Sequence, residues 1–191
     1  MKRIQAAVCF LLALVCVMTA CSARAPAASQ TGEVLADQPF YKIIQESAST
    51  YRYYLYDQNK KPVFDALLPR KPEIDMAGEK LVRISVAAGD SPSSVTTCYY
   101  DAAADVFSQK FIAVLDDNGT RLVQSESNRL VIRDIFDRSK FYQTVSEFSP
   151  PLSPKKQPIL SAELSEDGKS LRVTCLSGDP VRETVQNFKL D

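Results

Sequence analysis

Short runs of β-branched and aromatic residues, separated by turn residues, recur along most of this chain. From Tyr41 onward, Val, Ile, Tyr, Phe and Thr gather in such runs, and Asn, Asp, Gly or Pro interrupts them about every eight to twelve residues. No stretch keeps apolar residues at the i, i+3, i+4 spacing of a helix for three turns. The pattern therefore predicts an all-β domain, an antiparallel meander of about a dozen strands.

The expected strands are joined by turn signals of two kinds. A polar segment, 58–61, connects the first two strands, and Asp117-Asn118-Gly119 supplies residues that tolerate the positive φ of a tight primed turn. A proline-rich segment, 149–154, cannot pair as a central strand. The strands are expected at 51–57, 62–67, 80–87, 95–100, 106–115, 120–124, 130–135, 141–148, 159–164, 171–176 and 181–190.

One segment adds an expectation about how the hairpins assemble. Residues 162–171, Ala-Glu-Leu-Ser-Glu-Asp-Gly-Lys-Ser-Leu, resemble the turn-and-strand pattern of a β-propeller blade. The resemblance implies sheets of about 40 to 50 residues, of which roughly three fit after Tyr41, whereas a closed propeller has about four or more. The chain is therefore expected to form packed sheets, either a β-sandwich or an open propeller-like array.

The first twenty residues follow a different pattern. Lys2 and Arg3 are basic, and residues 6–17 are apolar over about a dozen positions, which is too short for a bilayer that needs roughly 20. This arrangement is typical of a signal peptide and not of a stable membrane span. Residues 1–20 are therefore predicted to be removed on export.

The signal peptide ends in Met18-Thr19-Ala20-Cys21, which resembles the lipobox of bacterial lipoproteins, with methionine where that family usually has leucine. Cys9 and Cys16 fit less well, because a valine precedes each. The resemblance implies lipidation of Cys21, with palmitate-type acyl chains, and a location on the extracytoplasmic side of the cell membrane or outer membrane. Two acyl chains anchor a protein stably, whereas one binds only marginally. Ordinary secretory cleavage after Ala20 is the alternative.

The remaining chain divides into two predicted parts. Residues 21–38 are small and polar, which is typical of a flexible tether with an end-to-end distance of roughly 20 to 25 Å. Residues 39–191 are predicted to form the all-β domain.

The chain has 23 basic and 23 acidic residues. Removal of residues 1–20 takes away two basic residues and no acidic one, so the net charge becomes −2. Nucleic acid is not an expected partner, because its binders carry a basic face.

The absence of histidine narrows the chemistry of this chain. With no His, the sequence excludes Ser-His-Asp and Cys-His catalysis and HExxH zinc sites. Gly168-Lys169-Ser170 lacks the upstream glycine of a phosphate-binding loop, since Glu163 stands there, and no acidic run has the spacing of a calcium loop. We therefore expect no cofactor, no metal and no enzymatic activity.

Local carboxylate pairs are the alternative source of chemistry. These are Asp101 with Asp105, Asp116 with Asp117, and Asp134 with Asp137. Two carboxyl groups at the right separation could hydrolyse a glycosidic bond. Adjacent acids in turns more often face water and cap backbone N–H groups, which is the expectation for Asp116 and Asp117.

Besides Cys21, two cysteines remain after the signal peptide. Cys98 and Cys175 both lie in strand-like runs, and an extracytoplasmic compartment permits a disulfide between them. Such a bond would stabilise the fold by about 4 kcal/mol on the chain-entropy account. Two buried thiols that pack as small apolar groups are an equal alternative.

Tyrosines supply the candidate binding surface. They lie on both faces of one expected strand and recur as a pair further on, so they could form an aromatic face that offers flat area and hydroxyl groups. A central strand covered on both sides is the alternative, and it is the favoured one. The residues are Tyr51, Tyr53, Tyr54, Tyr56, Tyr99 and Tyr100.

These observations favour a membrane-anchored extracytoplasmic lipoprotein with a non-enzymatic binding or structural β domain. Its expected partners are the membrane, through the lipid on Cys21, and an envelope protein or glycan. Two other functions stay open. One is a carboxylate-based hydrolase acting on envelope polysaccharide, and the other is an accessory subunit of an envelope complex.

Overall fold

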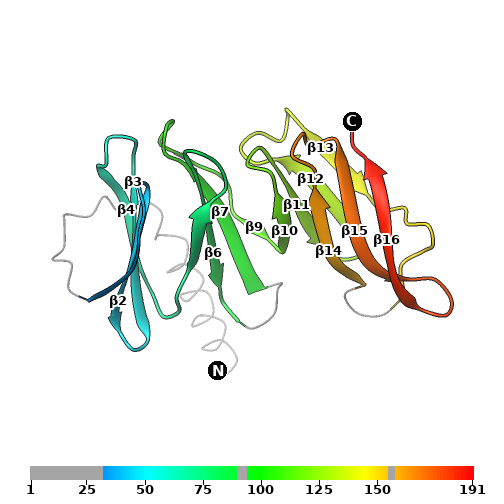
Figure 1. The fold of residues 1–191 in the computed structure, drawn as a ribbon, viewed down its shortest axis with the longest axis horizontal. Helices are drawn as coiled ribbons and strands as arrows, with labels where there is room; N and C mark the ends of the chain where they lie inside the picture. Colours follow the sequence, from blue (N-terminus) through cyan, green and yellow to red (C-terminus); the bar gives the residue numbers. More distant parts are fainter. Residues whose placement is uncertain (1–31, 90–93, 155–157) are drawn as a thin grey trace, which may run out of the picture. The chain divides into compact units, whose positions relative to one another are not determined.

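A computed structural model describes residues 32–89, 94–154 and 158–191 of the chain, and these residues are almost entirely β (Figure 1). Sixteen strands pair antiparallel in four separate sheets, and each pairs with a strand next to it in sequence except β9, which pairs with β7. No sheet formed by the described residues closes into a barrel. The prediction of an all-β meander that forms packed, open sheets is confirmed. The predicted signal peptide, Cys21 and the first part of the predicted tether lie outside the described residues.

The sheets follow one another along the sequence. Sheet A contains β1 (Glu33–Asp37), β2 (Tyr41–Ser47), β3 (Thr50–Tyr56) and β4 (Pro62–Leu68). Sheet B contains β5 (Glu73–Met76), β6 (Leu81–Ala87), β7 (Val95–Asp101), β8 (Val106–Phe107) and β9 (Phe111–Ile112). Sheet C contains β10 (Val114–Asp117), β11 (Arg121–Glu126), β12 (Arg129–Asp134) and β13 (Tyr142–Val145). Sheet D contains β14 (Ile159–Leu164), β15 (Ser170–Ser177) and β16 (Arg182–Lys189).

The structure differs from the sequence predictions in several segments, and β2 and β5 were not among the expected strands. The predicted tether, 21–38, is too long at its C-terminal end, because Glu33–Asp37 pair with β2 as the edge strand of sheet A. The single strand expected at 106–115 is three short strands, β8, β9 and β10, because the chain leaves sheet B for sheet C there. Ala113, between β9 and β10, has a φ of 54° and breaks the extended run.

The chain divides into two compact units, and the boundary between them in the sequence falls between Pro69 and Arg70. Unit 1 contains sheet A, and unit 2 contains sheets B, C and D. The described part beyond residue 39 is therefore two compact units where the sequence predicted one domain. No helix in the described ranges is long and apolar enough to cross a bilayer.

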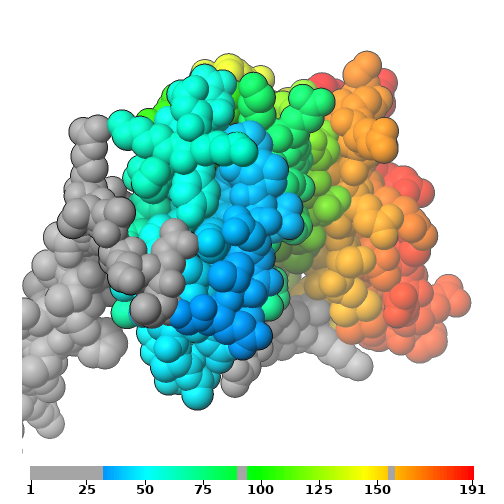
Figure 2. All heavy atoms as spheres, turned by 60° about the vertical axis from the view of Figure 1, so that its left-hand side comes forward, coloured from blue at the N-terminus to red at the C-terminus, as the bar shows by residue number. Residues whose placement is uncertain are grey.

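Both faces of sheet A carry buried side chains. Ile43 and Ile44 are adjacent on β2 and therefore point to opposite faces, yet they are only 2% and 1% exposed. On the face that contains Ile43, Tyr53 of β3 lies opposite Ile43, and Leu55 is fully buried between β2 and β4. Figure 2 shows the strands of this unit in blue and cyan. The period-2 alternation of a half-buried strand is therefore missing from β2 and β3.

Sheet C is the middle layer of unit 2 (Figure 1). On β11, Leu122 packs with Tyr99 and Phe111 of sheet B, while Val123 packs with Leu171 of sheet D. Successive side chains of a strand point to opposite faces, so one strand serves two cores. Each such buried aliphatic side chain contributes roughly 1.5 to 3 kcal/mol relative to exposure.

Candidate functional site

The structure places most of the candidate tyrosines in the core. Tyr99 and Tyr100 are fully buried, and Tyr53 and Tyr54 are 7% and 6% exposed. The half-buried ones are Tyr51 and Tyr56 of β3. A covered central strand, the favoured alternative, therefore describes four of the six residues, and these four do not form a surface that a partner could reach.

One polar face of sheet A keeps part of the aromatic character. The rings of Tyr54 and Tyr56 stack with their centroids 6.5 Å apart. Beside them on the same face, Arg52 donates to Glu46 at 2.5 Å and to Asp65 at 3.0 Å. The Tyr54 hydroxyl is buried without a hydrogen-bond partner, and burial raises the pKa of this hydroxyl. The charged groups of this face thus bind one another.

The two candidate cysteines lie in different sheets and are not joined. Cys98 is opposite Ile84 in sheet B, and Cys175 is opposite Thr184 in sheet D. Both residues belong to the described part of the chain, and the structure has no disulfide between them. The Cys175 sulfur is fully buried and lies 3.6 Å from the Gln186 amide nitrogen, which donates to it. The structure thus has two unbonded thiols, but only Cys175 is buried as that alternative expected, while Cys98 is half-buried.

In two of the three acid pairs, the first acid acts as a turn residue. Asp101 accepts from the backbone N–H groups of Ala103 and Ala104 at 2.8 and 3.1 Å. Asp134 accepts from those of Phe136 and Asp137 at 2.9 and 2.8 Å. These carboxylates satisfy local backbone donors, as turn acids usually do.

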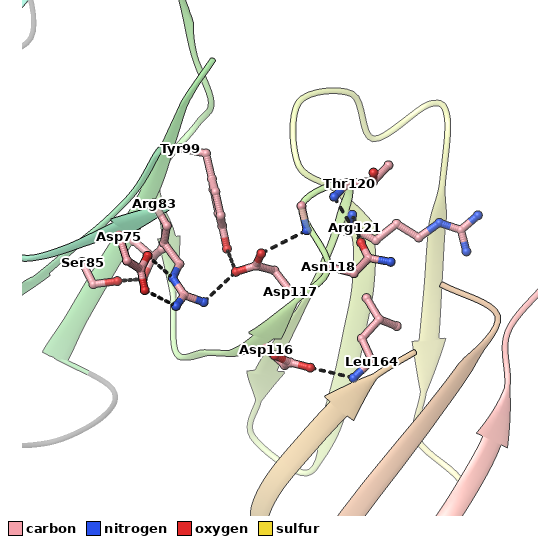
Figure 3. A network of polar contacts seen from close by, with 12 residues as sticks. Asp75, Arg83, Ser85, Tyr99, Asp116, Asp117, Asn118, Thr120, Arg121 and Leu164 are labelled. Carbon is pink, nitrogen blue, oxygen red and sulfur yellow. Dashed lines mark hydrogen bonds and ion pairs between the residues drawn. The ribbon is translucent and has the colours of Figure 1, made fainter. Parts of the chain in front are cut away.

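The third pair is different, because Asp117 is buried in a network that joins sheets B and C (Figure 3). Its side chain is only 2% exposed. Oδ2 accepts from Arg83 Nη1 at 2.8 Å and from the Tyr99 hydroxyl at 2.9 Å, and Oδ1 accepts from the Gly119 N–H at 3.1 Å. The expectation that Asp117 faces water is wrong, because its side chain is buried, whereas the expected cap on a backbone N–H group is present at Gly119.

Arg83 stands between two acids in this network. Its Nε and Nη2 donate to Asp75 at 2.9 and 2.5 Å, while Nη1 reaches Asp117. These contacts, with the bonds to Asp75 as the largest cause, raise the pKa of the Arg83 guanidinium. Burial, together with the charge of Asp117, raises the pKa of the Tyr99 hydroxyl, which therefore remains a donor. The network therefore links β6, β7 and β10 through side chains whose charged groups are paired with one another.

The same turn also reaches sheet D. Asp116 Oδ2 accepts from the Leu164 N–H at 2.7 Å. The side-chain amide of Asn118 donates to the carbonyls of Ser165 and Glu166, each at 3.2 Å. Asp116, Asp117 and Asn118 therefore bind two different sheets from one turn. We call residues 116–119 the inter-sheet turn.

The geometry of the inter-sheet turn also differs from the primed turn that was predicted. Among these four residues only Gly119 has a positive φ, 79°. The side-chain oxygen of Asn118, Oδ1, accepts hydrogen bonds from the backbone N–H groups of Thr120 and Arg121. A Cβ on Gly119 would lie 2.5 Å from the Ala77 carbonyl oxygen. Glycine is required here by the backbone conformation and by the approach of sheet B.

Two cavities flank the network. The larger, about 500 Å³, is lined by Met76, Arg83, Asn118 and Glu166 among others, and the smaller is about 280 Å³. Arg83 and Asp116 line both cavities. Within the described ranges, no three acidic or cysteine side chains are grouped so that they could hold a metal ion.

Comparison of the chain with protein families finds none that matches, and comparison with curated proteins finds no match either.

Arg83 was not among the candidate residues expected from the sequence, although it stands in mid-strand between Leu81 and Ser85, where a charge needs a partner. Its partner Asp117 lies 34 residues further along the chain.

Proposed function

We propose that this chain is an exported lipoprotein whose β units bind a partner or serve a structural role at the outer side of a membrane, without catalysing a reaction. The observation that carries the proposal is Met18-Thr19-Ala20-Cys21 directly after a short apolar run. An acylated Cys21 would hold the β units at the membrane and raise their local concentration near a membrane-bound partner. An envelope protein or glycan is the proposed partner.

The chemistry of the inter-sheet turn supports a binding or structural role over hydrolysis. An acid or base catalyst must reach a substrate, whereas Asp117 is 2% exposed and already accepts three hydrogen bonds. Asp116 is held by the backbone of sheet D through Leu164. These carboxylates stabilise contacts between sheets.

Acylation is tested by replacing the cysteine. Cys21→Ala is expected to abolish incorporation of labelled palmitate and to move the protein out of the membrane fraction of bacterial cells. Cys16→Ala is the matched control, because it removes another thiol of the same signal segment. Palmitate labelling that persists in Cys21→Ala would refute the proposed anchor.

The partner is tested separately, so that the two parts of the proposal fail independently. The full chain is cross-linked in intact cells, extracted with detergent and analysed by mass spectrometry. Enrichment of one envelope protein or glycan over a Cys21→Ala sample is the expected result. Recovery of the chain alone would contradict an envelope partner but leave the anchor standing.

A further inference from the structure

The edge strands of the described sheets differ in how open they are. Unprotected edges invite pairing with another chain, and proteins usually shorten, bulge or otherwise interrupt them. Pairing of β1, β10 and β14 with their neighbours contains register shifts, and β4 begins with a proline beside another shift. The edge strands β5, β8, β9 and β13 have four residues or fewer.

β16 has none of these features. It is eight residues long, contains no proline, and pairs with β15 without a shift from Arg182 to Lys189. Among the described residues, no strand pairs with its other side. In Figure 1 it is the red strand at the end of sheet D.

The alternation of backbone groups along β16 identifies those at the open edge. Leu190 N–H donates to the Lys169 carbonyl at 2.8 Å, so even-numbered residues of β16 turn their backbone groups toward β15. The odd-numbered residues therefore turn theirs to the open side. Their side chains are exposed on the outer face of sheet D: Glu183, Val185, Asn187 and Lys189.

We propose that the open edge of β16 binds the β16 edge of a second copy of this chain, antiparallel and about a two-fold axis beside Gln186. In this register Glu183 of each copy lies opposite Lys189 of the other, and Val185 lies opposite Asn187. All these residues belong to the odd-numbered set, so each pair can exchange both backbone hydrogen bonds. The interface is isologous, as in a closed symmetric dimer.

Charge decides the register and the occupant. Opposite charges that face each other across two antiparallel strands stabilise the pair, and like charges destabilise it. Moving the axis to Val185 would leave Glu183 opposite Asn187, and moving it to Asn187 would place Glu183 opposite Asp191. The axis beside Gln186 is the register that forms both ion pairs, so β16 is complementary to itself.

The test measures dimerisation of the full chain in detergent, with micelles in excess over chains, by sedimentation velocity. The wild-type chain is expected to dimerise. Glu183→Lys and Lys189→Glu should each weaken the dimer about ten-fold, because two attractive pairs become repulsive, and the double variant should restore affinity to within about three-fold of wild type. Glu163→Lys is the matched control, since it makes the same charge change at an exposed site on β14.

Each outcome decides the proposal. Restoration by the double variant, together with an unchanged dimer in Glu163→Lys, supports pairing through β16. A wild-type chain that stays monomeric up to about 100 µM, a double variant as weak as the single ones, or a control that weakens equally would overturn it. Far-UV circular dichroism of every variant verifies that the sheets remain folded.

Discussion

Replacement of Asp117 by asparagine tests whether the buried network holds sheets B and C together. The amide keeps the shape of the carboxylate but loses its charge and one acceptor oxygen. A hydrogen bond to a charged group contributes about 1.5 to 3 kcal/mol. Tyr99, which is fully buried, would lose its charged acceptor, whereas Arg83 is 34% exposed and keeps Asp75. The full penalty of a stranded buried ion, about 3 to 5 kcal/mol, therefore does not apply.

We expect Asp117→Asn to lower the free energy of unfolding by about 2 to 3 kcal/mol. Urea unfolding followed by circular dichroism measures it, because the chain has no tryptophan to serve as a fluorescent probe. Asp116→Asn is the control in the same turn. Its amide oxygen can still accept from the Leu164 N–H, so its loss should stay below about 1 kcal/mol.

A double-mutant cycle separates the hydrogen bond from general damage to the turn. Tyr99→Phe removes the hydroxyl that lies 2.9 Å from Asp117 Oδ2. If the two groups interact as described, the effects of Asp117→Asn and Tyr99→Phe will be non-additive by about 1 to 2 kcal/mol. Additive effects, within about 0.3 kcal/mol, would refute the buried network as a source of stability.

Three further predictions follow from the core and from shifted pKa values. Leu130→Ala, in the core shared by sheets C and D, should lower the free energy of unfolding by about 2 to 5 kcal/mol, while Leu160→Ala at an exposed site should change it little; urea unfolding measures both. The pKa of Tyr99 is raised in the folded state, so above about pH 10 the unfolded chain loses the hydroxyl proton first, and the stability of the fold decreases as the pH rises. Tyr99→Phe should make stability depend less on pH, as measured by unfolding at alkaline pH. The hydrogen bond from the Ser165 hydroxyl is the largest cause of the lowered pKa of Asp167, so Ser165→Ala should raise this pKa in an NMR titration. The stabilisation contributed by the Asp167 carboxylate would then be lost at a higher pH on acidification. An unchanged titration would contradict the 2.7 Å hydrogen bond between the two side chains.

Local pattern was sufficient for most strands. Ile159–Leu164 forms a strand as predicted, and the strands of sheets C and D other than β10 begin and end within a few residues of the predicted bounds. β-branched and aromatic residues favour extended backbone, and turn residues end each run, so these properties depend on neighbours in the sequence. β1 was missed because Glu33–Asp37 is a short segment in a small and polar stretch with no sustained apolar period, and it pairs because β2 presents an edge to it.

The candidate site depended on distant contacts instead. The sequence determined that the chain turns at Asn118-Gly119 and that Arg83 stands in a strand, because both follow from local residue preferences. Only the tertiary structure decided that Asp117 is buried, since the stacking of sheets B and C brings Arg83 and Tyr99 to it across 34 and 18 residues of chain. Burial of a charge requires partners, and the positions of partners in space are set by how the sheets pack.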